Sequence, residues 1–119
     1  MSDVHNKIIE LKDENDLQKE AINIEKYVSP KDYVIVCDIY GENLNSEELA
    51  RLIDNTFSYY GTIDFIIGSS YGVNDSIKNR ANKLISFSNF TMPHGLFRGV
   101  LLEQIYRSFK INNNESYHK

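Results

Sequence analysis

The residues with the clearest chemical potential follow three apolar runs of the chain. Asp38 ends one such run, Gly68–Gly72 comes directly after Thr62–Ile67, and the aromatic and polar segment Ser86–His94 ends a third run. In parallel α/β sheets the carboxyl ends of the strands meet at one edge, where ligands bind. The spacing therefore predicts a ligand site built from three loops at one edge of a sheet.

Each of these loops also has a structural interpretation that the sequence leaves open. Small residues in Gly68–Gly72 would let a ligand approach backbone N–H groups, but a plain strand-to-helix turn fits too, because the loop matches no phosphate-binding fingerprint. Asp38 could face a hydroxyl or amine of a ligand, or be a solvated acid at a strand end. His94 could contact a substrate, or cap or pack the helix that follows it.

Several kinds of chemistry have no support in the sequence. Cys37 is the one cysteine, so an internal disulfide and a multi-cysteine zinc site are excluded, and a buried apolar role is expected for its thiol. There is no nucleophile elbow and no pair of histidines four residues apart. We therefore expect no metal.

The composition is that of one ordinary globular domain spanning residues 1–119, with 41% apolar and 25% charged residues. A net charge of -4 argues against a strongly cationic nucleic-acid coat protein, although a small basic patch stays open. The apolar runs are too short to span a membrane, and the N-terminus lacks the order of a signal peptide. A cytoplasmic location is the expectation, with no membrane partner.

The elements that must position the three loops alternate between strands and helices. This alternation predicts an α/β fold with a mostly parallel sheet flanked by helices. Asn45 and Glu48 form a capping-box pattern at the start of one helix. The predicted strands are Lys7–Leu11, Tyr33–Cys37, Thr62–Ile67 and Leu84–Phe87, with a turn at Gly41–Asn45. The predicted helices are Asn15–Val28, one from Asn45 through Phe57, Asn74–Asn82, and one from Pro93 to about Ile111.

The last helix and the C-terminal tail carry basic and aromatic residues. Arg98 and Arg107 lie on that helix, and Tyr117–Lys119 ends the chain. An aromatic, histidine and basic terminus could stack on a base and touch a phosphate. A frayed tail is the other interpretation.

Four segments in the second half of the chain follow one another in a specific order. They are Phe65–Gly72, Leu84–His94, Leu101–Ile111 and Tyr117–Lys119. Together they closely resemble the ribosomal RNA large subunit methyltransferase H family, small SPOUT-class enzymes that methylate N3 of a pseudouridine in 23S rRNA. The resemblance extends back through Val34–Gly41 and Asn45–Leu49.

The resemblance implies a C-terminal trefoil knot, a homodimer that acts on ribosomal RNA in the assembled ribosome, and S-adenosylmethionine held by the three loops. It implies catalytic roles for Tyr117, His118 and Arg107, with His118 either accepting a proton or orienting the base. The RNA-binding residues it implies are His94, Arg98 and Lys119. The cofactor-binding residues it implies are Cys37, Asp38, Gly41, Ile67, Gly68, Ser69, Gly72, Ile85, Ser86, Phe87, Phe90 and Thr91.

The chain also departs from the family pattern. It begins after the family's first strand and helix, and Ser69 stands where a second glycine is usual. Glu42 and Asn113 replace residues that are commonly basic, and Gly95 and Gly99 replace bulkier ones. Three hypotheses follow: an active minimal methyltransferase, which the intact tail favours, an impaired paralogue, or a non-enzymatic dimeric scaffold.

Overall fold

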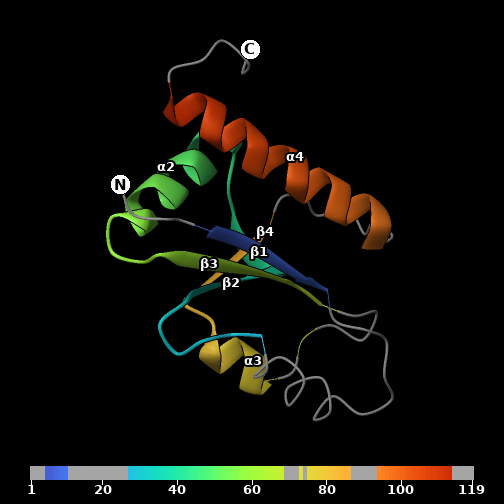
Figure 1. The fold of residues 1–119 in the computed structure, drawn as a ribbon. Coiled ribbons are helices and arrows are strands. Elements are labelled where there is room, and N and C mark those ends of the chain that lie inside the picture. Colours follow the sequence, from blue (N-terminus) through green and yellow to red (C-terminus); the bar gives the residue numbers. More distant parts are fainter. Residues whose placement is uncertain (1–4, 11–26, 69–72, 74, 87–93, 114–119) are drawn as a thin grey trace.

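The chain folds around a parallel sheet with helices on both faces (Figure 1). The computed structural model describes residues 5–10, 27–68, 73, 75–86 and 94–113. Within these ranges the sheet has four strands in the order β1-β3-β2-β4. The elements are β1 His5–Glu10, β2 Tyr33–Asn43, α2 Ser46–Phe57, β3 Thr62–Ile67, α3 Asp75–Arg80, β4 Lys83–Ser86 and α4 His94–Asn112.

The sheet is parallel at every pairing between these strands. β3 pairs with β1 on one side and with β2 on the other, and β4 pairs with the far side of β2. The two central strands are rich in β-branched residues, and both are buried where they pair with each other, at Val34–Cys37 of β2 and Ile63–Ile67 of β3, as expected for strands covered on both faces. The α/β class with a parallel sheet is thus confirmed.

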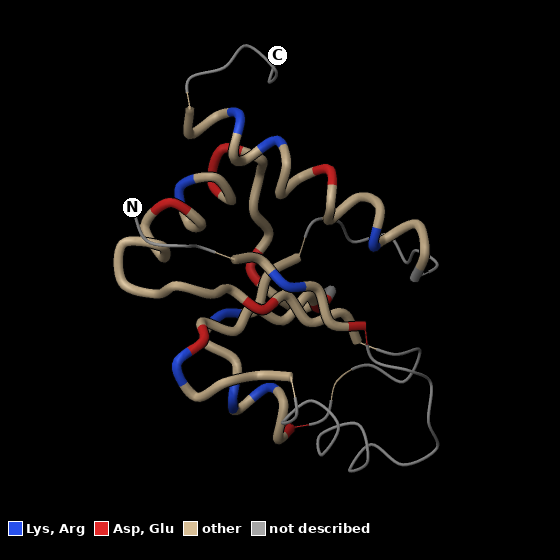
Figure 2. The backbone as a smooth tube through the Cα atoms, in the orientation of Figure 1, with Lys and Arg blue, Asp and Glu red and all other residues tan. Residues whose placement is uncertain are grey.

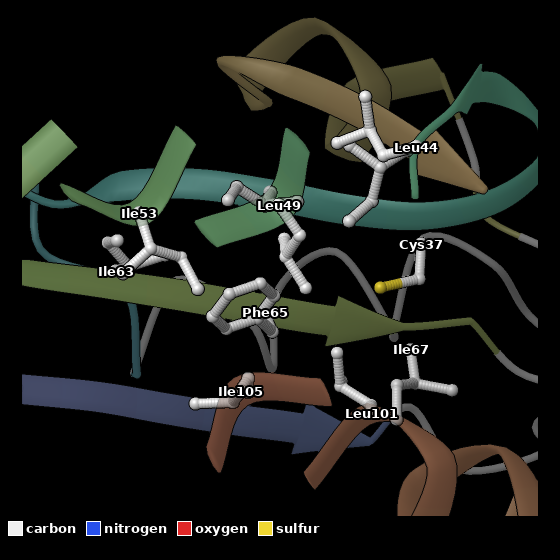
Figure 3. Packing of buried hydrophobic residues seen from close by; sticks show 11 residues of the cluster. Cys37, Leu44, Leu49, Ile53, Ile63, Phe65, Ile67, Leu101 and Ile105 are labelled. Atoms are coloured by element: carbon white, nitrogen blue, oxygen red, sulfur yellow. The ribbon is translucent and has the colours of Figure 1, made fainter. Parts of the chain in front are cut away.

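Alternation along the strands divides the core into two layers. Ile63, Phe65 and Ile67 of β3 point toward α2 and α4, where they meet Leu49, Ile53, Leu101 and Ile105 (Figure 3). The opposite face of the sheet carries a smaller cluster beneath α3, built from Val34, Val36, Ile66 and Ile77. Figure 1 shows α2 and α4 on one side of the sheet and α3 on the other.

The two helices on the larger face are fixed to each other by polar contacts as well as by packing. The capping box predicted for α2 is present: Asn45 Oδ1 accepts from the Glu48 amide at 2.8 Å, and Glu48 Oε1 accepts from the Asn45 amide at 2.9 Å. The Ser46 hydroxyl lies 2.6 Å from Gln104 Oε1 of α4. The capping box fixes the start of α2, and the Ser46–Gln104 contact joins that start to α4.

Two predicted boundaries are wrong. The turn expected at Gly41–Asn45 is absent, because β2 continues to Asn43 after an irregularity and pairs again with β4. Tyr27 and Val28, expected to end a helix, lie in a turn and an irregular segment, while the rest of that helix falls outside the described residues. The knot depends on residues 87–93, which also lie outside the described ranges, and it stays a prediction.

Candidate functional site

The carboxyl ends of β3 and β4 meet the middle of β2 at one edge of the sheet. Cys37 of β2 pairs with Ile67 of β3 on one side and with Ile85 of β4 on the other. Gly68 directly follows Ile67, and Ser86 directly follows Ile85. The structure therefore brings together six of the residues named from the sequence at this edge, counting Asp38 after Cys37.

Residues Asp38 to Gly41 bulge out of the sheet at this edge. Both Cys37 and Glu42 pair with Ile85, so the four residues between them are left out of the ladder with β4. A bulge of this kind frees backbone groups from the ladder and changes the direction of the strand. Its backbone N–H and C=O groups are thus placed where a ligand above the strand ends would meet them.

Gly41 closes the bulge against β4. A Cβ at this position would lie 2.6 Å from the backbone nitrogen of Ile85 and 2.7 Å from its carbonyl carbon. Real side chains do not reach such separations, so the return of β2 to the ladder requires glycine here. The resemblance assigned Gly41 to the cofactor, and the structure adds a packing reason for this residue.

The side chains at the three strand ends are mostly part of the core. Cys37, Ile67, Ile85 and Ser86 are all buried, so what they offer a ligand is backbone. Burial raises the pKa of the Cys37 thiol to about 12, which leaves it protonated and without nucleophilic character near neutrality. The edge provides a binding surface and no nucleophile among these residues.

Asp38 is held by the protein itself. Its Oδ1 accepts a hydrogen bond from the Tyr40 amide at 3.2 Å, and its Oδ2 lies 3.6 Å from Nζ of Lys78 on α3. That this carboxylate faces a ligand stays a prediction. What the structure shows is that Asp38 forms an ion pair within the chain. Sequence analysis missed Lys78, because it lies forty positions after Asp38 and no spacing rule joins them.

Arg98, predicted to meet RNA, lies near the same edge. Its Nε is 3.1 Å from Oε1 of Glu10, the last residue of β1. The acidic end of β1 thus anchors the first turns of α4, and a partly exposed guanidinium stays at the surface. α4 begins at His94, as predicted for a helix starting near Pro93.

Arg107, predicted to be catalytic, is not brought to this edge within one chain. It lies nine residues after Arg98, about 13 Å along an α-helix. Its Nε donates to Oε1 of Glu103 at 3.0 Å, one turn back on the same helix. If Arg107 serves a site at the strand ends, a second chain must supply it.

The remaining predicted site residues are not placed. The side chain of His94 is not described. The others lie outside the described ranges: Ser69, Gly72, Phe87, Phe90, Thr91, Tyr117, His118 and Lys119.

Two further features of the described residues bear on other functions. No cluster of three or more His, Cys, Asp or Glu side chains suited to a metal ion occurs among them. None of their helices combines the length and apolar character needed to cross a membrane.

Comparisons with known proteins define the class to which this fold and edge belong. Residues 2–118 match the family described as "Predicted SPOUT methyltransferase", and the chain belongs to this family of methyltransferases. Ribosomal RNA large subunit methyltransferase H of Caldicellulosiruptor saccharolyticus is 48% identical over 93% of this chain and 78% of its own length. The proteins of that name from Streptococcus equi subsp. zooepidemicus and Fusobacterium nucleatum subsp. nucleatum are 46% and 42% identical. The alignments cover 87% and 94% of this chain, and 65% and 78% of those relatives. The resemblance read from the sequence is confirmed.

Proposed function

We propose that this protein transfers a methyl group from S-adenosylmethionine to N3 of a pseudouridine in 23S rRNA. The observation that carries the proposal is the meeting of Cys37, Ile67 and Ile85 at one sheet edge, in a chain whose relatives are named rRNA methyltransferases. Chains matched this closely along most of their length usually share a reaction as well as a fold.

The residues present at the edge fit the methyl donor. The bulge between Cys37 and Glu42 leaves backbone donors and acceptors beside Gly68, and these can hydrogen-bond an adenine edge or a ribose. Gly41 keeps the bulge close to β4, so the backbone of Ile85 and Ser86 lies beside it. The loop residues Ser69, Gly72, Phe87, Phe90 and Thr91 are proposed to complete the contacts.

The donor, when bound, supplies an electrophilic methyl group on a sulfonium sulfur. The protein's tasks are then to hold N3 in line with that methyl group and to give the N3 proton an acceptor. We assign the proton to His118 or to a water oriented by it, since a histidine titrates near neutrality. Tyr117 is proposed to orient the base, while Arg107, Arg98, His94 and Lys119 contact RNA.

A homodimer would complete the site. α4 carries a stripe of small and apolar residues on the side turned away from the core, at intervals of four and three residues: Gly95, Gly99, Leu102, Tyr106 and Phe109. Leu102 and Tyr106 are 49% and 52% exposed, and a Cβ on either glycine would meet nothing within 4 Å. A helix that is apolar on two sides is expected to be covered on both.

The same helix carries positive charge for RNA. Arg98, Arg107 and Lys110 outnumber the single acidic residue Glu103 along α4, and Figure 2 shows long uncharged stretches between them. In an antiparallel pairing of two α4 helices, Arg107 of one chain approaches the strand ends of the other. In this arrangement Arg107 reaches the strand ends of the partner chain, although it is far from those of its own chain.

Calorimetric titration with S-adenosylmethionine, and with S-adenosylhomocysteine alongside, tests the cofactor directly. Saturable binding at one site per chain or per dimer is expected. Ribosomes lacking the modification should then gain one methyl group on pseudouridine, detected by mass spectrometry of the nucleosides. No binding at millimolar ligand by a folded dimer would overturn the enzyme proposal and favour a scaffold.

Light scattering in solution tests the dimer. The chain should report twice its 13.8 kDa mass, and Leu102→Glu should give a folded monomer that no longer methylates. Tyr59→Glu is the matched control, because Tyr59 is 87% exposed and lies outside α4. A monomeric wild-type chain would contradict the composite site.

Deleting Tyr117–Lys119 tests the tail. Methylation should be lost while the affinity for S-adenosylmethionine changes little, because the tail is assigned to the base and not to the cofactor. Unchanged turnover would rule out the catalytic roles of Tyr117 and His118.

A further inference from the structure

The helix α3 follows β3 in the chain and covers the smaller core layer of the sheet. Ile77 anchors the helix in the smaller core layer, where it is 3% exposed. At the far end of α3, Arg80 Nη2 donates to the carbonyl oxygens of Ser29 and Asp32 at 2.9 and 3.1 Å. Both contacts fix α3 to the body of the protein and away from the strand ends.

At the strand ends, Lys78 joins α3 to β2. Its ammonium group lies 3.6 Å from Oδ2 of Asp38, the first residue of the β2 bulge. The Asp38 side chain is 14% exposed and its other oxygen accepts from the Tyr40 amide, so the carboxylate is held in one orientation. Through this pair α3 and the bulge are tied together.

We propose that Lys78 is a positioning residue for the cofactor site, acting through Asp38 on the bulge of β2. This inference rests on the proposed function for its ligand. The geometry itself does not depend on the ligand: one ion pair links the bulge of β2 to α3. Without it, the bulge and α3 would each be held by their own contacts alone.

The physical expectation is a small effect on stability and a larger one on binding. The Lys78 side chain is 39% exposed, and partly exposed ion pairs add little to the free energy of unfolding. A loop that must adopt one conformation to bind, however, weakens the affinity in proportion to the fraction of time it spends in others.

Substitution of Lys78 by Met keeps the length of the aliphatic chain and removes the charge. Lys78→Met should raise the dissociation constant and KM for S-adenosylmethionine about fivefold, with kcat at saturation within about twofold and an unchanged melting temperature. Lys78→Arg should restore most of the affinity, because a guanidinium can still pair with Asp38.

The matched control is Lys83→Met. Lys83 also pairs with a carboxylate, Glu42 at 3.1 Å, and its side chain is 32% exposed, but it does not contact Asp38. An equal loss of affinity in Lys83→Met would show that the Asp38 pair has no specific role and would overturn the proposal.

Asp38→Asn separates positioning from direct contact with the ligand. If Lys78 acts through Asp38, the double variant Lys78→Met/Asp38→Asn should bind S-adenosylmethionine no more weakly than the single variant with the lower affinity. Additive losses would overturn the proposal in favour of a direct ligand contact by Lys78.

Amide hydrogen exchange on the ligand-free protein keeps the two proposals distinguishable. Lys78→Met should speed exchange at Gly68, Val73 and the α3 amides, and leave α2 unchanged. If the wild type binds no S-adenosylmethionine but this change is seen, the proposed function fails and the positioning role stands. If the wild type binds and neither exchange nor affinity changes, the positioning role is wrong.

Discussion

Charges at the two ends of the sheet are held in different ways. In the amino-terminal half, Lys7 of β1 lies 3.3 Å from a fully buried carboxyl, Asp64 of β3, and 3.6 Å from Asp32. At the carboxyl ends, the pairs Asp38–Lys78 and Glu10–Arg98 are partly exposed. The first arrangement serves the fold, while the second leaves charges within reach of a ligand.

The two acids beside Lys7, Asp32 and Asp64, have pKa values shifted in opposite directions. Neither Asp64 oxygen accepts a conventional hydrogen bond, and burial, reinforced by neighbouring Asp32, raises the pKa of Asp64 to about 7. Burial opposes ionisation of Asp32 too, but hydrogen bonds from Asp64 and the Ser29 amide, with the charge of Lys7, lower its pKa overall. Below about pH 7 Asp64 therefore keeps its proton beside an ionised Asp32.

The largest expected effect on the free energy of unfolding comes from a substitution of Gly41, beside β4. Gly41→Ala places a Cβ within 2.6 Å of the β4 backbone, and neither strand can move without disturbing the ladder. We expect a loss of about 3 kcal/mol in the free energy of unfolding, measured by urea denaturation. Tyr40→Ala is the control: Tyr40 is 86% exposed in the same bulge and should change stability by less than about 0.5 kcal/mol. A stable Gly41→Ala protein would show that the bulge can be rebuilt.

The next largest effect is on the pH dependence of the free energy of unfolding, which tests the amino-terminal half of the sheet. A carboxyl whose pKa is raised on folding binds its proton more tightly in the native state, so its stabilising contribution is full below about pH 4 and is lost as pH rises through about 7. Asp64→Asn mimics the protonated form and should escape this loss. Relative to wild type, the variant should gain about 3 kcal/mol between pH 4.5 and pH 8 in chemical denaturation.

Asp54→Asn is the matched control for this pH series. Asp54 lies exposed on α2, and its replacement should leave the pH dependence of wild type intact. A difference between Asp64→Asn and wild type that stays constant with pH would show that Asp64 is ionised throughout.

The strands and the capping box could be predicted from the sequence because they follow from local patterns. The meeting of three strand ends could be predicted because parallel strands have their carboxyl ends at the same edge of a sheet. The prediction from the sequence ended β2 too early, since glycine at position 41 suggests a turn, while the structure uses it for close approach to β4. It passed over Lys7, Asp64 and Lys78 because their partners lie on other elements, and no spacing along one chain reveals such pairs.

The smallest effect on stability is expected at the exposed pair of the carboxyl end. Arg98→Gln removes the contact with Glu10 and should change the free energy of unfolding by less than about 0.5 kcal/mol, since the guanidinium is 58% exposed. If Arg98 contacts RNA phosphate, the same change should weaken binding to a 23S rRNA fragment and lower the slope of log affinity against log salt by about 1. Arg51→Gln removes an equal charge from an exposed site on another helix, α2, and should leave that slope unchanged. A loss of stability without a change in slope would place Arg98 with the buried charges of the other end, as part of the fold, and would remove it from the RNA surface.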